Sequence, residues 1–178
     1  RYSAYQGGAI YTANSNETAR NLLIENCQFI QNHADRSAGA ASAFGYNSRV
    51  INCTFESNTV YNDRNISPFG GALQIGMDNV FSNGKVYDCK FINNYVKSST
   101  TGSHGGAGCV RDGIEYKNCI FINNSAYQGG ALTYHASGLI KNCTFLNNSA
   151  SAFGGALSTG FLYNTMDLNI VDCIFNGN

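Results

Sequence analysis

The 178-residue sequence has little charge, because only 12% of its residues are Asp, Glu, Lys or Arg, against the usual quarter or so. Its 11 basic and 11 acidic residues cancel. A chain without a basic excess lacks the electrostatic footprint of a nucleic-acid-binding protein. No apolar run reaches the roughly 18 residues that a membrane-spanning helix needs, so we expect no membrane insertion by this segment.

Tryptophan is absent and proline occurs once, whereas the chain has 20 Gly, 11 Tyr and 11 Phe. Few residues favour helices, and this composition is typical of short strands joined by many turns. The length allows one domain with a sizeable core. The sequence shows no signal peptide, and it stops at Asn178 directly after a repeated motif. We therefore expect residues 1–178 to be a single domain from a longer repeat protein.

A motif of Asn or Asp, then Cys-x-Phe-x-x-Asn, occurs six times, with successive phenylalanines 24 to 36 residues apart. Such internal repetition is the signature of a solenoid, in which neighbouring repeats bury a shared core. The repeated residues are Cys27, Cys53, Cys89, Cys119, Cys143 and Cys173, then Phe29, Phe55, Phe91, Phe121, Phe145 and Phe175, and finally Asn32, Asn58, Asn94, Asn124, Asn148 and Asn178.

Within each repeat the apolar period is two, since Cys and Phe are constant and the residue between them varies. This pattern predicts a strand with Cys and Phe inward. A large side chain three residues before each Cys predicts a second strand, and the Asn or Asp before Cys suits the bend between the two. A third strand is expected at Gly-Gly-Ala-aliphatic segments such as 70–73 and 129–132, where glycine allows close backbone approach.

Three short strands and three bends per repeat predict an all-β parallel β-helix, or β-solenoid, of about six rungs. Stacked rungs lie about 4.8 Å apart, which places like residues over one another. We expect the phenylalanines to form the main core column. We expect the closing asparagines to form a ladder of side-chain amides that also satisfies backbone groups at the corner.

The segments NCIFINNSAYQGGAL (118–132) and NCTFLNNSASAFGGAL (142–157) carry both motifs together. They resemble the repeats of chlamydial polymorphic outer-membrane proteins, and they look still more like the adhesin-like surface proteins of methanogenic archaea. The resemblance covers essentially the whole chain. It implies a right-handed parallel β-helix in a long extracellular protein that mediates adhesion or builds a cell-surface structure.

The cysteines allow two interpretations. An extracellular chain with seven cysteines suggests disulfides, but stacked Cβ vectors are parallel, which strains a bridge. We therefore expect a reduced, buried ladder of six thiols. Cys109 lies near an outward position and is the candidate for an exposed thiol, either unpaired or bridged to another molecule. No paired Cys-x-x-Cys spacing occurs, so we expect neither a structural metal nor a cofactor.

Charged residues in the loops before Gly-Gly-Ala form the other candidate site. Asp35 and Arg36 in one repeat and Asp63 and Arg64 in the next would stack into a surface patch. A polysaccharide lyase or hydrolase on this fold would need two or three such groups converging on one face. Ordinary surface ion pairs explain the same residues, and they contribute little energy.

Six Asn-x-Ser/Thr sequons occur in this Asn-rich chain. Asn52 and Asn142 lie at corners where their side chains should be engaged. Asn16 lies in a loop, and Asn123 and Asn147 occupy outward positions, so these three are the candidate glycosylation sites.

Two function classes follow from the sequence. The first is an extracellular cell-surface protein without enzymatic activity, an adhesin or structural rod. Its partners would be a glycan or protein of a host or neighbouring cell, or further copies of itself joined end to end. The second is a carbohydrate-active β-helix enzyme. Scarce charge, short regular loops and the resemblance favour the first class.

Overall fold

The computed structural model describes residues 4–12, 21–62, 67–76, 82–98, 102–111, 113–159 and 167–178. In these residues 24 short strands form four parallel sheets of six strands each. The first sheet contains β1 (Ala4–Gln6), β5 (His33–Ser37), β9 (Thr59–Asn62), β13 (Tyr95–Ser98), β17 (Ser125–Gln128) and β21 (Ser149–Phe153). The second contains β2 (Ile10–Tyr11), β6 (Ala41–Ala43), β10 (Leu73–Ile75), β14 (Gly108–Val110), β18 (Leu132–Tyr134) and β22 (Leu157–Thr159).

The other two sheets carry the Cys-x-Phe strands and the strands that precede them. The third sheet contains β3 (Leu23–Glu25), β7 (Arg49–Ile51), β11 (Lys85–Tyr87), β15 (Ile114–Lys117), β19 (Gly138–Lys141) and β23 (Leu168–Val171). The fourth contains β4 (Gln28–Ile30), β8 (Thr54–Glu56), β12 (Lys90–Ile92), β16 (Ile120–Ile122), β20 (Thr144–Leu146) and β24 (Ile174–Asn176).

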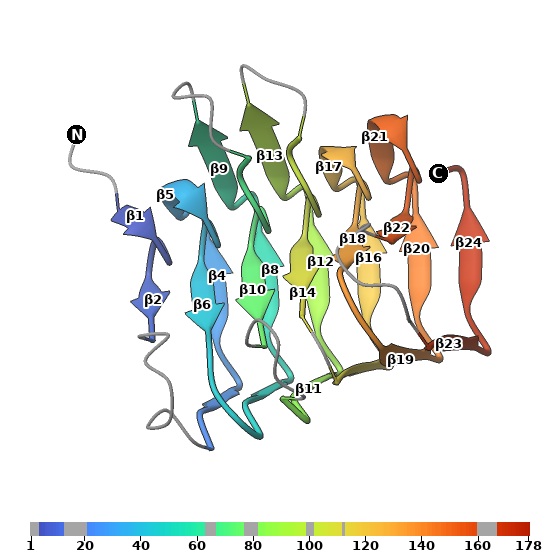
Figure 1. Cartoon of the computed structure of the whole chain (residues 1–178), viewed down its shortest axis with the longest axis horizontal. Helices are drawn as coiled ribbons and strands as arrows, with labels where there is room; N and C mark the ends of the chain where they lie inside the picture. The colour runs from blue at the N-terminus through green and yellow to red at the C-terminus, as the bar shows by residue number, and fades with distance from the viewer. Residues whose placement is uncertain are drawn as a thin grey trace.

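The chain visits the four sheets in a fixed order and then repeats the circuit, so successive rungs lie side by side from the N-terminal to the C-terminal end (Figure 1). The predicted all-β parallel β-helix of six rungs is therefore confirmed. The described part of the chain has no helix. Accordingly, none of its segments is a helix long and apolar enough for a membrane crossing.

Each rung has four strands, so the prediction of three per rung was wrong. The additional strand follows the closing asparagine and belongs to the first sheet. It turns one small or β-branched side chain inward, and Val60, Val96 and Ala126 form a small apolar cluster of their own there. A single apolar residue per strand leaves almost no alternation in the sequence, which is why the period-two pattern did not reveal it.

The phenylalanine column is the centre of the core, as predicted. Phe55, Phe91, Phe121 and Phe145 are fully buried. Adjacent rings in the column stack with centroids 4.7–4.9 Å apart and with planes within 6° of parallel. The strand spacing of the solenoid imposes this face-to-face geometry. The same core contains residues of the second sheet such as Leu73 and Leu132, and the central residues of the third-sheet strands, namely Ile24, Val50, Val86, Tyr116 and Ile140.

Two kinds of backbone constraint produce the bends. The Asn or Asp before each Cys has a positive φ of 50–56°, as predicted for that corner, and these two residue types tolerate this region best after glycine. At the Gly-Gly corner, Gly70 has φ 61°. A Cβ on its neighbour Gly71 would collide with the carbonyl oxygen of Gly106 in the next rung. The second glycine therefore serves close approach and the first serves the turn.

Candidate ligand groove

The six repeated cysteines form the predicted reduced column, since all seven cysteines of the chain are free thiols. Cys53, Cys89, Cys119 and Cys143 are buried, whereas Cys27 and Cys173 in the end rungs are partly exposed. The thiols donate to carbonyl oxygens, as Cys53 Sγ does to the oxygen of Ile51 at 3.1 Å. Burial raises the pKa of Cys119 well above its usual range. Because they are buried and donate to backbone carbonyl oxygens, the four central thiols act as small apolar groups rather than as nucleophiles.

The closing asparagines form the predicted amide ladder. In its centre, Asn124 Oδ1 accepts from the backbone N–H of Asn94 at 2.9 Å and from Asn94 Nδ2 at 3.0 Å. Asn124 Nδ2 donates to the carbonyl oxygen of Phe91 and to Asn148 Oδ1, both at 2.9 Å. Every polar atom of this fully buried amide is satisfied, which makes the ladder a structural element and not a free binding site.

A second, exposed ladder runs along the corner before each Cys. Asn52 Nδ2 donates to Asn26 Oδ1 at 2.7 Å, and Asn142 Nδ2 donates to Asn118 Oδ1 at 2.8 Å. The side chains of Asn52 and Asn142 are therefore engaged, as the sequence predicted. In the same ladder Asp88 accepts from the Asn118 amide, so this solvated corner accommodates a carboxylate.

Asn123 and Asn147 are exposed and lie at the next corner, with φ of 53° and 52°. Their positions are compatible with the glycosylation prediction, which remains a prediction. The third candidate, Asn16, lies outside the described residues.

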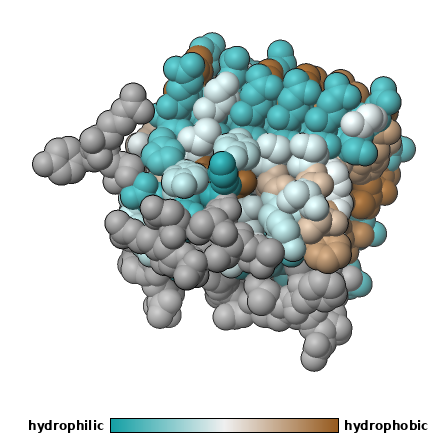
Figure 2. Space-filling view, turned by 90° about the horizontal axis from the view of Figure 1, so that it is seen from above, coloured by the Kyte–Doolittle hydropathy of each residue, from teal (hydrophilic) through white to brown (hydrophobic). Residues whose placement is uncertain are grey.

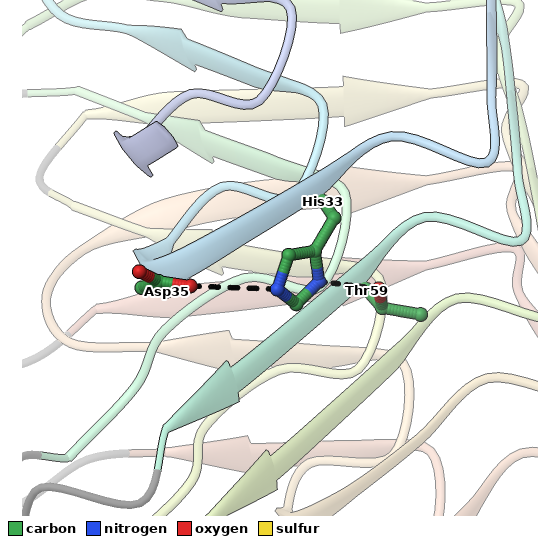
Figure 3. A network of polar contacts seen from close by, with 3 residues as sticks. All are labelled: His33, Asp35 and Thr59. Atoms are coloured by element: carbon green, nitrogen blue, oxygen red, sulfur yellow. Dashed lines mark hydrogen bonds and ion pairs between the residues drawn. The ribbon is translucent and has the colours of Figure 1, made fainter. Parts of the chain in front are cut away.

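The surface patch is described only in part, because Asp63 and Arg64 lie outside the described residues. On β5, His33 Nε2 lies 3.5 Å from Asp35 Oδ1, and its Nδ1 lies 2.9 Å from Thr59 Oγ1 on the next rung (Figure 3). Arg36 instead lies over the ring of Tyr5, with its Cζ 5.4 Å from the ring centroid. The two adjacent charged residues of β5 thus make different contacts.

The outer face of the second sheet is covered, although its side chains point away from the core. Leu73 and Ile75 of β10 lie in the core, so Gln74 between them points outward. Nevertheless Gln74 is only 5% exposed, and its register neighbours Cys109 and Thr133 are fully buried. Other parts of each rung must therefore fold over this face.

Rings from both flanks of the second sheet provide part of this cover. Phe69 and His104 precede the Gly-Gly corner and stack with centroids 5.2 Å apart. His135 follows β18 and packs edge-on against both, with centroids 6.0 Å and 5.5 Å away. Arg111 follows β14, and its Cζ lies 5.4 Å from the ring centroid of Phe69. We call these four residues the aromatic cover.

Arg111 is the one cation of the aromatic cover near pH 7, because its two histidines are neutral. Burial, and after it the charge of Arg111, lowers the pKa of His104. The same causes, with a smaller effect of His104, lower the pKa of His135 to about 3. Both imidazoles are therefore neutral near pH 7, and the guanidinium of Arg111 is the charged group of the cover.

Cys109 is not the exposed thiol that the sequence suggested. It occupies the outward position of β14, as expected, but its exposed fraction is 0%. Phe69 and His104 occupy an equivalent position of the repeat, but the residue type there varies from rung to rung, so the repeat alone did not indicate rings over this face.

Toward the N-terminal rungs the same face opens into a groove with a volume of about 440 Å³. This falls in the range of small-ligand sites. The groove is lined by Tyr5, Gln6, Tyr11, Arg36, Ser37, Phe44, Phe69, Gln74 and Arg111. Among these, Arg36 is the residue that the sequence analysis named as part of a candidate site. The available signal was that the residue before Gly-Gly varies from rung to rung, with Gln6, Phe69, His104, Gln128 and Phe153 in equivalent places.

Comparison with known proteins gives one match. The family model of the Chlamydia polymorphic membrane protein repeat matches residues 118–133 and 142–160. Each segment begins at the corner asparagine before Cys and extends past Gly-Gly-Ala into the second sheet. No curated protein and no solved structure matches the chain. The resemblance to the polymorphic membrane protein repeat is thus supported, whereas the resemblance to archaeal adhesin-like proteins is not.

Proposed function

We propose that this chain is part of an extracellular cell-surface rod that mediates attachment through the outer face of its solenoid. The observation that carries the proposal is a contrast between columns. The core columns repeat the same residue in rung after rung, whereas the column before Gly-Gly contains Gln, Phe and His at equivalent positions. Positions whose residue type is not fixed by the stacking of rungs are the ones available for recognition.

The match to the polymorphic membrane protein repeat supports a location at the outer membrane or cell surface. A solenoid also suits this role, because it presents an extended outer surface without needing a large globular core. Hydrophilic residues form rows that repeat along one edge of the solenoid in Figure 2. We propose attachment rather than catalysis as the role of the chain, in keeping with its low content of charged residues.

The ends of the solenoid offer a second mode of attachment, by stacking. The last rung exposes Ile174 by 59% and Phe175 by 47%, and apolar residues gather at this end in Figure 2. At the other end Ile30 is 50% exposed. Exposed apolar groups beside unpaired strand edges are a template for another strand. A further rung, from the same chain or from another copy, would cover them.

Two experiments test these modes separately. Beads coated with the folded chain should attach to a panel of cells and immobilised glycans, and beads coated with the unfolded, alkylated chain should not. Equal attachment of both, or attachment of neither, would contradict the proposal, and release of reducing sugar from the panel would favour a carbohydrate-active enzyme. Light scattering over a concentration series should show association that grows with concentration. A concentration-independent monomer would exclude stacking of copies.

A further inference from the structure

The groove over the N-terminal rungs combines apolar rings with polar groups. Tyr5 and Tyr11 are about half exposed at its mouth, whereas Phe44 is buried. Flat rings of this kind contact the C–H faces of sugar rings, and sites for small ligands combine such surfaces with a few polar groups that fix orientation.

Two of the polar groups in the groove are buried and have no hydrogen-bond partner among the described residues. They are Gln74 Oε1 and Ser37 Oγ, in residues that are 5% and 2% exposed. A buried polar atom without a partner destabilises a fold, and a native protein retains it where it serves another purpose. Both residues line the groove, so a hydroxyl-rich ligand seated there brings hydrogen-bond donors close to them.

The charge of the groove is positive. Arg36 and Arg111 are its charged lining residues in the described part of the chain. Arg36 is only partly buried and lies over Tyr5, so its guanidinium is held at the mouth by a stacking contact. Guanidinium groups pair with carboxylates through two parallel hydrogen bonds.

We propose that the groove binds a short saccharide that carries a carboxylate, as a uronic acid does. The sugar faces lie on the tyrosine rings, the hydroxyl groups lie against Gln74 and Ser37, and the carboxylate pairs with Arg36. This inference rests on the attachment function proposed above and deepens it by naming the class of ligand.

The probes are trisaccharides of galacturonate, mannuronate and glucuronate, each compared with its methyl ester, which keeps the sugar and removes the charge. Calorimetric titration of the native chain should show binding of at least one acid. The affinity for its methyl ester should be lower by a factor of at least about ten. Binding of none of the acids, or equal binding of acid and ester, would overturn the proposal.

Two variants assign the binding to the groove. Arg36→Gln should weaken binding of the acid about tenfold or more and leave binding of the ester unchanged. Arg49→Gln is the matched control, because Arg49 is exposed on β7 in the third sheet and does not line the groove. Gln74→Leu should also weaken binding, while its urea midpoint should stay at or above that of the wild type because Gln74 Oε1 has no partner to lose. Equal weakening by both arginine variants would overturn the assignment.

The outcome is distinguishable from a failure of the attachment function. If the coated beads still attach when Arg36 is replaced and no acidic trisaccharide binds, the groove inference is wrong and attachment uses another surface. If neither beads nor trisaccharides bind, both proposals are wrong.

Discussion

Replacing Asn124 with aspartate tests the buried amide ladder most directly, because it exchanges one –NH₂ group for an oxygen at nearly constant volume. The acceptor Oδ1 and its two bonds from Asn94 remain. The two donations from Nδ2, to the carbonyl oxygen of Phe91 and to Asn148 Oδ1, are lost. In their place a carboxylate oxygen faces two acceptors that were both 2.9 Å from the nitrogen.

The cost has two parts with different pH dependence. While the aspartate is charged, two lost hydrogen bonds at about 0.5–1.5 kcal/mol each destabilise the chain by about 1–3 kcal/mol. The protonated acid has one O–H donor and regains about half of this. Burial beside two acceptors also disfavours the charged carboxylate and raises its pKa above about 3.9. If that pKa exceeds 7, the second part reaches about 4 kcal/mol at pH 7. Because the folded-state pKa is raised, this part is fully present above that value and disappears as the pH falls toward 4.

Urea unfolding at pH 7 and pH 4, followed by tyrosine fluorescence and circular dichroism, measures both parts. Asn124→Asp should lose more stability at pH 7 than at pH 4, relative to the wild type at each pH. Asn124→Ala should lose about 1–3 kcal/mol at both.

Asn26→Asp is the matched control in the exposed ladder. There Asn26 Oδ1 accepts from Asn52, in the role that Asp88 already fills toward Asn118. Its cost should stay within about 0.5 kcal/mol. The ladder argument would be refuted by an unchanged midpoint for Asn124→Asp at pH 7, or by equal costs in the two ladders.

Three further outcomes are expected. Phe121→Ala should lower the free energy of unfolding by about 3–5 kcal/mol. Phe175→Ala, at a site that is already 47% exposed, should lower it clearly less. Equal urea midpoints for the two variants would contradict the stacked core. A thiol reagent should leave Cys109 unmodified in the native chain and modify it in urea, as read by peptide mass spectrometry; native labelling would restore the exposed-thiol interpretation. The lowered pKa of His135, about 3, means that the unfolded state binds more protons between pH 3 and 6.5, so stability should fall on acidification through this window by up to a few kcal/mol. His135→Gln should reduce that pH dependence, whereas identical pH profiles for this variant and the wild type would show that His135 does not contribute.

The solenoid and its columns could be predicted from the amino-acid sequence alone. Identical spacing of Cys, Phe and Asn in six repeats leaves one arrangement in which every repeat buries the same residues, namely rungs stacked in register. The bend before each Cys could also be predicted, since Asn and Asp are residues that tolerate its positive φ. The reduced state of the cysteines also followed from the sequence, because parallel Cβ vectors strain a bridge.

The tertiary structure alone decided the features that do not repeat. The strand after the ladder asparagine carries one inward side chain per rung, too few for a periodic signal. Cys109 is buried although it occupies an outward position, and Phe69, His104 and His135 contact one another although they lie on different rungs and on both flanks of the second sheet. Whether Arg36 lines a groove or only pairs with a neighbouring loop depends on how the Gly-Gly corner folds one sheet toward the next. These features depend on contacts between rungs. The residues that make them lie far apart in the sequence and share no regular spacing, so the sequence pattern does not predict that they meet.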